Sequence, residues 1–249
     1  MALYLVGGAT VFFGAGVLAM AGLGAAFLFV PLFYYLGVPL AEATSTALLL
    51  NAVSLSAATV TYARGRLIDW RAGIPVLIAA VLLAPVGAGL TAHVDRTLLL
   101  ALFVVFLVFA GAMMLFYRAR ASRRDRGAVA EAGVGATVGA VAGFLGGLLG
   151  VGGGNIILPG LTWLGLDPKV AAGTTALAVV FSSLSGFLGH AALGGLDPVF
   201  LITMALLAAG GSLAGSHLMR TRLTGAQLKR FIGVLLWVIA AKMALDLLA

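Results

Sequence analysis

The residues of this chain that could do chemistry are uncharged: a run of glycines followed by an amide, and a pair of hydroxyl groups. Glycines occupy positions 152–154 directly before Asn155, and Thr174 and Thr175 follow further along the chain. Backbone N–H groups, an amide and hydroxyls can all donate hydrogen bonds to an oxyanion without adding net charge. Glycine also lets the backbone approach a ligand, since no side chain obstructs it. The pattern predicts an uncharged anion site.

The same pattern occurs a second time, 128 residues earlier. The stronger copy reads GFLGGLLGVGGGNIILPGLTWLGLDP from Gly143 to Pro168, and the weaker copy reads GAGVLAMAGLGAAFLFVPLFYYLGVP from Gly14 to Pro39. With one residue inserted, the hydroxyl pairs of the two copies also align. The candidate substrate-binding residues are therefore Gly152, Gly153, Gly154, Asn155, Thr174 and Thr175 in the second copy, and Gly24, Ser45 and Thr46 in the first. Further polar residues continue both hydroxyl-bearing segments: Asn51, Ser54, Ser56 and Thr59, then Ser182, Ser183 and Ser185.

The sequence around these residues is that of a membrane protein. Of the 249 residues, 62% are hydrophobic, 9% are charged and 35 are glycine, which excludes an ordinary soluble domain. The chain has no cysteine, so disulfides, thiol redox chemistry and cysteine-ligated metals are excluded. Its three scattered histidines make a poor metal site. We therefore expect no cofactor and no enzymatic activity.

Ten apolar segments, five in each half, predict an all-α integral membrane protein built from two repeats. The segments are residues 2–22, 25–38, 41–63, 71–92 and 97–117, then 129–149, 154–167, 170–190, 198–219 and 229–248. The first repeat would cover residues 1–117, a basic cytoplasmic linker residues 118–128, and the second repeat residues 129–249. The second and seventh segments are short and begin beside the glycines, so each repeat is expected to contain one broken helix.

The positive charges predict how the chain is oriented, because Lys and Arg collect in cytoplasmic loops. If every segment crosses the membrane, 13 of the 15 positive residues fall in four loops on one side. If the short segments were re-entrant, the loop at 220–230 would lie on the opposite side from the linker. Five crossings in each half make the second repeat inverted, with both termini outside. The net charge of +7 therefore indicates membrane topology and contact with anionic lipid, not nucleic acid.

The short segments could supply the anion site. A helix from Asn155 to Leu166 would be about 18 Å long, whereas the hydrocarbon core is about 30 Å thick. Such a helix must begin part-way through the membrane, with free N–H groups and partial positive charge at its start. A second helix beginning near Ala26 would point inward from the opposite face. Two such ends meeting near the midplane would bind an anion without a fixed cation.

Each of these features also has a purely structural interpretation. Glycines allow membrane helices to pack closely, an explanation that suits Gly143, Gly146 and Gly147 best. Pro31 and Pro159 can simply kink their helices, and serine or threonine hydroxyls can bond back to their own helix. Acidic residues are nearly missing from the apolar segments, so the carboxylate relay of a proton pump is not indicated.

The stretch GGLLGVGGGNIILPGL (Gly146–Leu161), followed by AAGTTALAVVFSSLSG (Ala171–Gly186), resembles the TauE/SafE family of sulfite exporters and related permeases. The resemblance covers essentially the whole chain. It implies an integral plasma-membrane transporter, mostly bacterial, for sulfite, organosulfonates or other small sulfur-containing anions. It places the site on Gly152, Gly153, Gly154, Asn155 and Pro159, with Thr174 and Thr175 beside them. The first copy, Gly22-Leu23-Gly24-Ala25-Ala26, departs from the family pattern, which tends toward more glycine.

We therefore expect a secondary transporter, an exporter by its resemblance, that moves a small inorganic or organosulfur anion by alternating access in the cell membrane. The alternatives are a passive anion channel and a non-catalytic membrane scaffold or subunit. An enzyme would need an acid–base cluster, and a scaffold a partner-binding extension, neither of which the sequence contains. The exact anion, the direction, the coupling ion and a homo-oligomeric state are left open.

Overall fold

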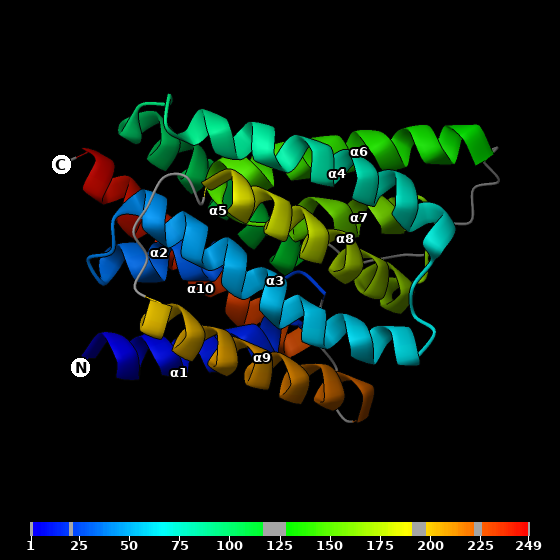
Figure 1. Ribbon diagram of the computed structural model, residues 1–249, viewed down its shortest axis with the longest axis horizontal. Helices are drawn as coiled ribbons and strands as arrows, with labels where there is room; N and C mark the ends of the chain where they lie inside the picture. The colour runs from blue at the N-terminus through cyan, green and yellow to red at the C-terminus, as the bar shows by residue number, and fades with distance from the viewer. Residues whose placement is uncertain (1, 20–21, 117–127, 191–197, 222–225, 249) are drawn as a thin grey trace.

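The computed structural model describes residues 2–19, 22–116, 128–190, 198–221 and 226–248, and within these ranges all of the regular secondary structure is helical (Figure 1). The helices are α1 (Ala2–Ala19), α2 (Ala26–Tyr35), α3 (Leu40–Arg64), α4 (Trp70–Thr91), α5 (Arg96–Phe116), α6 (Ala128–Leu149), α7 (Gly154–Trp163), α8 (Pro168–His190), α9 (Pro198–Thr221) and α10 (Ala226–Leu248). Each of the ten predicted segments is thus found as a helix. The predicted basic linker lies outside the described residues, apart from Ala128.

Several of these helices are suited to a lipid environment. Among the described residues, five helices are long and apolar enough to cross a membrane: α3, α4, α6 from Glu131, α8, and α9 up to His217. On α4 the exposed side chains Ile74, Ile78, Leu82 and Val86 recur every four residues and form one apolar stripe. In water an exposed apolar stripe of this kind would favour aggregation, whereas against lipid chains it is in a favourable environment. The chain is therefore a multi-pass membrane protein.

The two halves of the chain pack in equivalent ways. Helix α1 packs on α9 as α6 packs on α4, and α3 packs on α9 as α8 packs on α4. In Figure 1, α4 and α6 accordingly lie along one side of the molecule and α1 and α9 along the other. Helices α3 and α8 cross each other, and α5 packs on α10. Exchanging the halves preserves these pairings, which agrees with the predicted duplication. The direction in which each half crosses the membrane stays a prediction.

Small residues allow the closest of these contacts. Gly139, Gly143 and Gly147 lie four residues apart on α6, and a methyl group on any of them would overlap a carbonyl oxygen of α4. Gly16 on α1 and Gly215 on α9 meet in the same manner. Such contacts let helix backbones approach in a membrane, where no hydrophobic force drives helices together. The close-packing interpretation of Gly143 and Gly147 is confirmed.

The short helices α2 and α7 have 10 residues each, which corresponds to about 15 Å. Both end in the same way, at Gly37 with φ +89° and at Gly165 with φ +100°. The residue after each glycine donates its N–H to the carbonyl five residues back, at 3.0 and 3.2 Å. This arrangement is a Schellman cap, which stops a helix. It ends α7 at Trp163, three residues before the end predicted from the sequence.

Candidate functional site

The breaks before the two short helices share one backbone conformation. Gly24 in the first break and Gly152 in the second both have φ +74°. Left-handed values of this size suit glycine, because it has no Cβ to clash with the backbone. The second break takes one further left-handed residue, Gly153, also with φ +74°, whereas its counterpart Ala25 has φ −113°. The two breaks therefore share their backbone angles at Gly24 and Gly152, and they differ at the following residue, Ala25 in one and Gly153 in the other.

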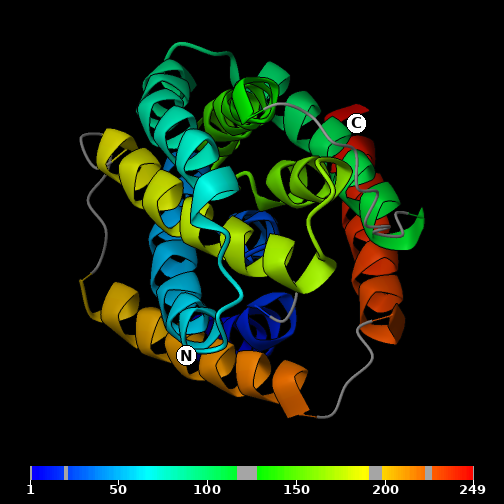
Figure 2. The same ribbon diagram turned by 90° about the vertical axis from the view of Figure 1, so that its right-hand side faces the viewer.

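The two breaks lie against one another and against the other half of the chain. Gly154, the first residue of α7, packs so closely on the carbonyl of Leu23 that a Cβ would overlap it. Gly22 packs on the Ala172 carbonyl of α8, and Gly150 packs on Thr44 of α3. In the end-on view of Figure 2, α2 and α7 lie toward the interior with longer helices around them. The α7 start therefore meets the first break inside the protein, and the midplane position of this contact stays a prediction.

A polar pair, Asn51 on α3 and Ser183 on α8, stands between the breaks. Asn51 Oδ1 accepts hydrogen bonds from the backbone N–H groups of Ala25 (2.8 Å) and Ala26 (3.3 Å). Asn51 Nδ2 donates to Ser183 Oγ at 2.9 Å. The amide orientation follows from chemistry, because only the oxygen can accept from backbone donors. Both side chains are fully buried. Asn51 thus caps the start of α2 and joins α3 to α8.

The start of α7 has no equivalent cap. In the alignment that pairs Ser54 with Ser183, Asn51 pairs with Val180, which has no polar group. The N-cap residue of α7 is Gly153, which has no side chain, and among the described residues no side chain is seen bonded to the first N–H groups of this helix. Asn155, in its first turn, is 2% exposed, and its Oδ1 has no hydrogen-bond partner among the described residues. The first N–H groups of a helix lack partners within it. Of the two helix starts, that of α7 therefore has more N–H groups available to donate hydrogen bonds to a polar ligand.

All nine residues predicted from the sequence are buried, and the structure separates their roles. Gly24 and Gly152 both lie against the Asn51 amide. The hydroxyl of Thr174 instead accepts a hydrogen bond from the N–H of Asp69, at 2.9 Å, where α4 begins. The hydroxyls of Ser45 and Thr175 are buried and have no partner among the described residues. Unpaired buried hydroxyls are rare in proteins, and a polar ligand would satisfy them.

The spaces beside two predicted site residues are filled by the protein's own backbone. A Cβ on Gly153 would overlap the Ala142 carbonyl of α6, and one on Gly154 would overlap the Leu23 carbonyl. These glycines therefore set how closely α7 approaches its neighbours. The sequence interpretation did not include Asn51 in the site, although a lone amide in an apolar membrane helix was a usable signal, since buried polar groups there are usually functional.

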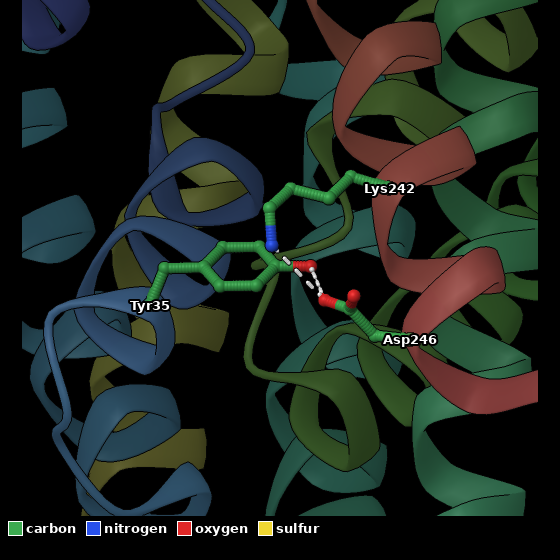
Figure 3. Close-up of polar contacts among 3 residues, drawn as sticks. All are labelled: Tyr35, Lys242 and Asp246. Atoms are coloured by element: carbon green, nitrogen blue, oxygen red, sulfur yellow. Dashed lines mark hydrogen bonds and ion pairs between the residues drawn. The ribbon is translucent and has the colours of Figure 1, made fainter. Parts of the chain in front are cut away.

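Lys242 forms a polar cluster with Tyr35 and Asp246 (Figure 3). Its Nζ is 3.0 Å from Asp246 Oδ2 and 3.8 Å from the centre of the Tyr35 ring, and the Tyr35 hydroxyl donates to the same Asp246 oxygen at 3.0 Å. Lys242 and Asp246 are 58% and 53% exposed. The cluster joins α10 to the end of α2, whereas Asn51 caps its start, about 14 Å away along the helix. Lys242 therefore supplies no charge to the centre.

The polar residues that are buried among the described side chains are serine, threonine, asparagine and one histidine, so the centre of this bundle is polar but carries no fixed charge. Broken helices that meet around such a centre are typical of membrane transporters. The chain belongs to the family described as "Sulfite exporter TauE/SafE", whose match covers residues 7–243. That range contains both breaks, and it confirms the resemblance read from the glycine and threonine motifs. No curated protein and no solved structure was found to match the chain.

Proposed function

We propose that this protein is a secondary transporter of the cell membrane that exports sulfite or another small sulfur-containing anion. The observation that carries the proposal is the contact between two helix starts around the Asn51–Ser183 pair, in a chain of a sulfite exporter family. Helix starts attract anions because their N–H groups and partial positive charge point at the ligand. The anion would bind where the two halves meet.

In this proposal the α7 start and the hydroxyls around it hold the ligand. Asn155, Thr175 and Ser45 are three of the described side chains that have an unpaired buried polar atom, and each can reorient a donor toward an oxyanion. The two repeats are inverted, so that rocking of one half against the other opens the site to each side of the membrane in turn. The close backbone contacts at the breaks correspond to a state in which the halves are together.

Counterflow in proteoliposomes tests this function directly. Vesicles preloaded with sulfite should take up labelled sulfite faster than empty vesicles. The reason is that a carrier exchanges an unlabelled sulfite from inside the vesicle for a labelled one from outside. The panel should include thiosulfate, sulfoacetate and sulfate, which identifies the preferred anion. A passive channel would instead show conductance far above carrier turnover without counterflow. A membrane scaffold would move none of these anions, and that result would refute the proposal.

The inverted arrangement predicts which sites face outward. Single-cysteine variants Leu3→Cys and Arg123→Cys can be compared cleanly, because the natural chain has no cysteine. A membrane-impermeant thiol reagent should label position 3 in intact cells and position 123 only after permeabilisation. The prediction depends on the 13 of 15 positive residues that fall on one side. Equal labelling of both positions, or a cytoplasmic C-terminus, would rule out the inverted five-plus-five arrangement.

The two adjacent threonines should respond differently to valine. Thr175→Val removes an unpaired buried hydroxyl, so we expect unchanged or higher stability and an anion affinity weaker by about 1–3 kcal/mol. Thr174→Val leaves the Asp69 N–H without its acceptor, so we expect lower stability and a smaller effect on affinity. Thermal unfolding with and without anion separates the two effects. If Thr175→Val binds the anion as tightly as wild type, Thr175 does not contact the ligand.

A further inference from the structure

The starts of the two short helices are chemically unequal. Two N–H groups at the α2 start, those of Ala25 and Ala26, are already bonded to the Asn51 side chain. Among the described residues no side chain is seen bonded to the first N–H groups of α7, whose N-cap residue is Gly153, and Val180 stands at the position that aligns with Asn51. Both starts lie in the same buried region, where Gly154 of α7 touches Leu23 of the first break. The protein's own Asn51 amide therefore occupies N–H groups at the start of α2, whereas no such amide is seen on those of α7 among the described residues.

The Asn51 oxygen occupies the place that an anion would take at α2. An amide oxygen carries partial negative charge and accepts hydrogen bonds in the manner of an oxyanion, but it brings no net charge. While Asn51 remains bonded to α2, the N–H groups of Ala25 and Ala26 cannot be donated to an anion. One helix start contributes roughly half an elementary charge, and two would contribute about twice as much.

Asn51 also determines what Ser183 can do. Because Ser183 Oγ accepts from Asn51 Nδ2, the proton of this hydroxyl points to another partner. Ser183 lies beside Gly152, since a Cβ on that glycine would be 2.7 Å from Ser183 Oγ. Asn51 therefore leaves the Ser183 proton available for another acceptor, beside the second break, while its own oxygen caps the start of α2.

We propose that Asn51 is a specificity-determining residue that acts as the built-in ligand of α2 and so restricts the transporter to singly charged oxyanions. This inference rests on the proposed function, because it concerns the same site. With Asn51 in place, the anion is held by one helix start and neutral donors. Without it, the second helix start becomes available, and the site can compensate a doubly charged anion.

Two substitutions distinguish this role from that of a simple helix cap. Asn51→Asp keeps an oxygen acceptor for α2, and aspartate is as good a cap as asparagine, so a purely structural role predicts normal function. The proposal predicts the opposite, because the variant places a full negative charge beside the anion and loses the donor to Ser183. Asn51→Ala frees the α2 start, so a structural role predicts lost stability without any change in selectivity.

The experiment measures counterflow and anion-dependent thermal stabilisation of the full-length protein with methanesulfonate and sulfate. These probes are similar tetrahedral oxyanions with one and two charges, and neither changes its charge near neutral pH. For Asn51→Asp we expect a melting temperature near that of wild type and methanesulfonate affinity reduced about tenfold or more. For Asn51→Ala we expect the affinity ratio to shift toward sulfate by about tenfold. Ser56→Ala is the matched control, since its exposed hydroxyl bonds only to Ala52 of the same helix in the described contacts.

The possible outcomes are distinct. If Asn51→Asp transports as well as wild type and Asn51→Ala keeps the wild-type selectivity, Asn51 is only a cap, and the inference is overturned while the transporter function stands. If Asn51→Ala does not fold, the Asn51→Asp result alone decides, because that variant keeps the cap. If the wild-type protein neither binds nor moves any anion of the panel, the proposed function fails first, and the inference fails with it.

Discussion

A Gly153→Ala protein is expected to lose anion transport and to be clearly less stable than a Gly37→Ala protein. Both glycines have left-handed backbones, with φ +74° and +89°, so alanine at either position costs about 1–2 kcal/mol. At position 37 nothing lies within 4 Å of the added methyl group, whereas at position 153 it would overlap the Ala142 carbonyl. Overpacking of this kind adds about 1–3 kcal/mol. The methyl group should also push the α7 start away from the site.

Unfolding in detergent and counterflow in proteoliposomes check this prediction on the same two preparations. Gly37→Ala carries the same backbone strain without the overlap, so it should still transport and serves as the matched control. Valine at position 153 would overlap the same carbonyl, so a loss of transport in that variant could not separate a blocked ligand path from the overlap. Equal stability and transport in the two alanine variants would show that the contact between Gly153 and Ala142 is unimportant.

The helices and the breaks could be predicted from the sequence because their signals are local. Apolar runs of membrane length mark each helix, and glycine clusters mark the points where a regular helix stops. The duplication follows from residues at one fixed offset, such as Gly24 and Gly152. The end of α7 was placed three residues too late, because the cap at Gly165 depends on a left-handed conformation that this glycine adopts in the fold.

The partners of the polar side chains could not be predicted, because they lie far away in the sequence. Thr174 bonds to a residue 105 positions earlier, and Asn51 bonds to Ser183, 132 positions later. No periodicity encodes such pairs, so the sequence pattern includes Thr174 in the predicted site and leaves Asn51 out. The structure shows that one anchors the start of α4 and the other caps α2. The same holds for Gly153 and Gly154, whose neighbours are backbone carbonyls of other segments.

The second large effect concerns the charge of the ligand. The wild-type protein is expected to bind methanesulfonate or hydrogen sulfite at least about 100-fold more tightly than sulfate, a difference of about 2.7 kcal/mol. Burying an ionic charge is costly, and the cost rises with the square of the charge, whereas the attraction of helix starts and hydroxyls rises only in proportion to it. The described residues at the centre offer no fixed cation that would compensate a second negative charge.

Competition of methanesulfonate and sulfate for labelled sulfite uptake at one pH measures this difference. Lys242→Met is the informative control, because Lys242 is the cation that the sequence places within the last apolar segment. Since its ammonium is paired with Asp246 at an exposed position beside the end of α2, the variant should keep the wild-type ratio of affinities. If sulfate competes as well as methanesulfonate and Lys242→Met abolishes that competition, the lysine reaches the ligand in another conformation. If sulfate competes well in both proteins, two helix starts share the anion, and Asn51 must leave α2 when the ligand binds.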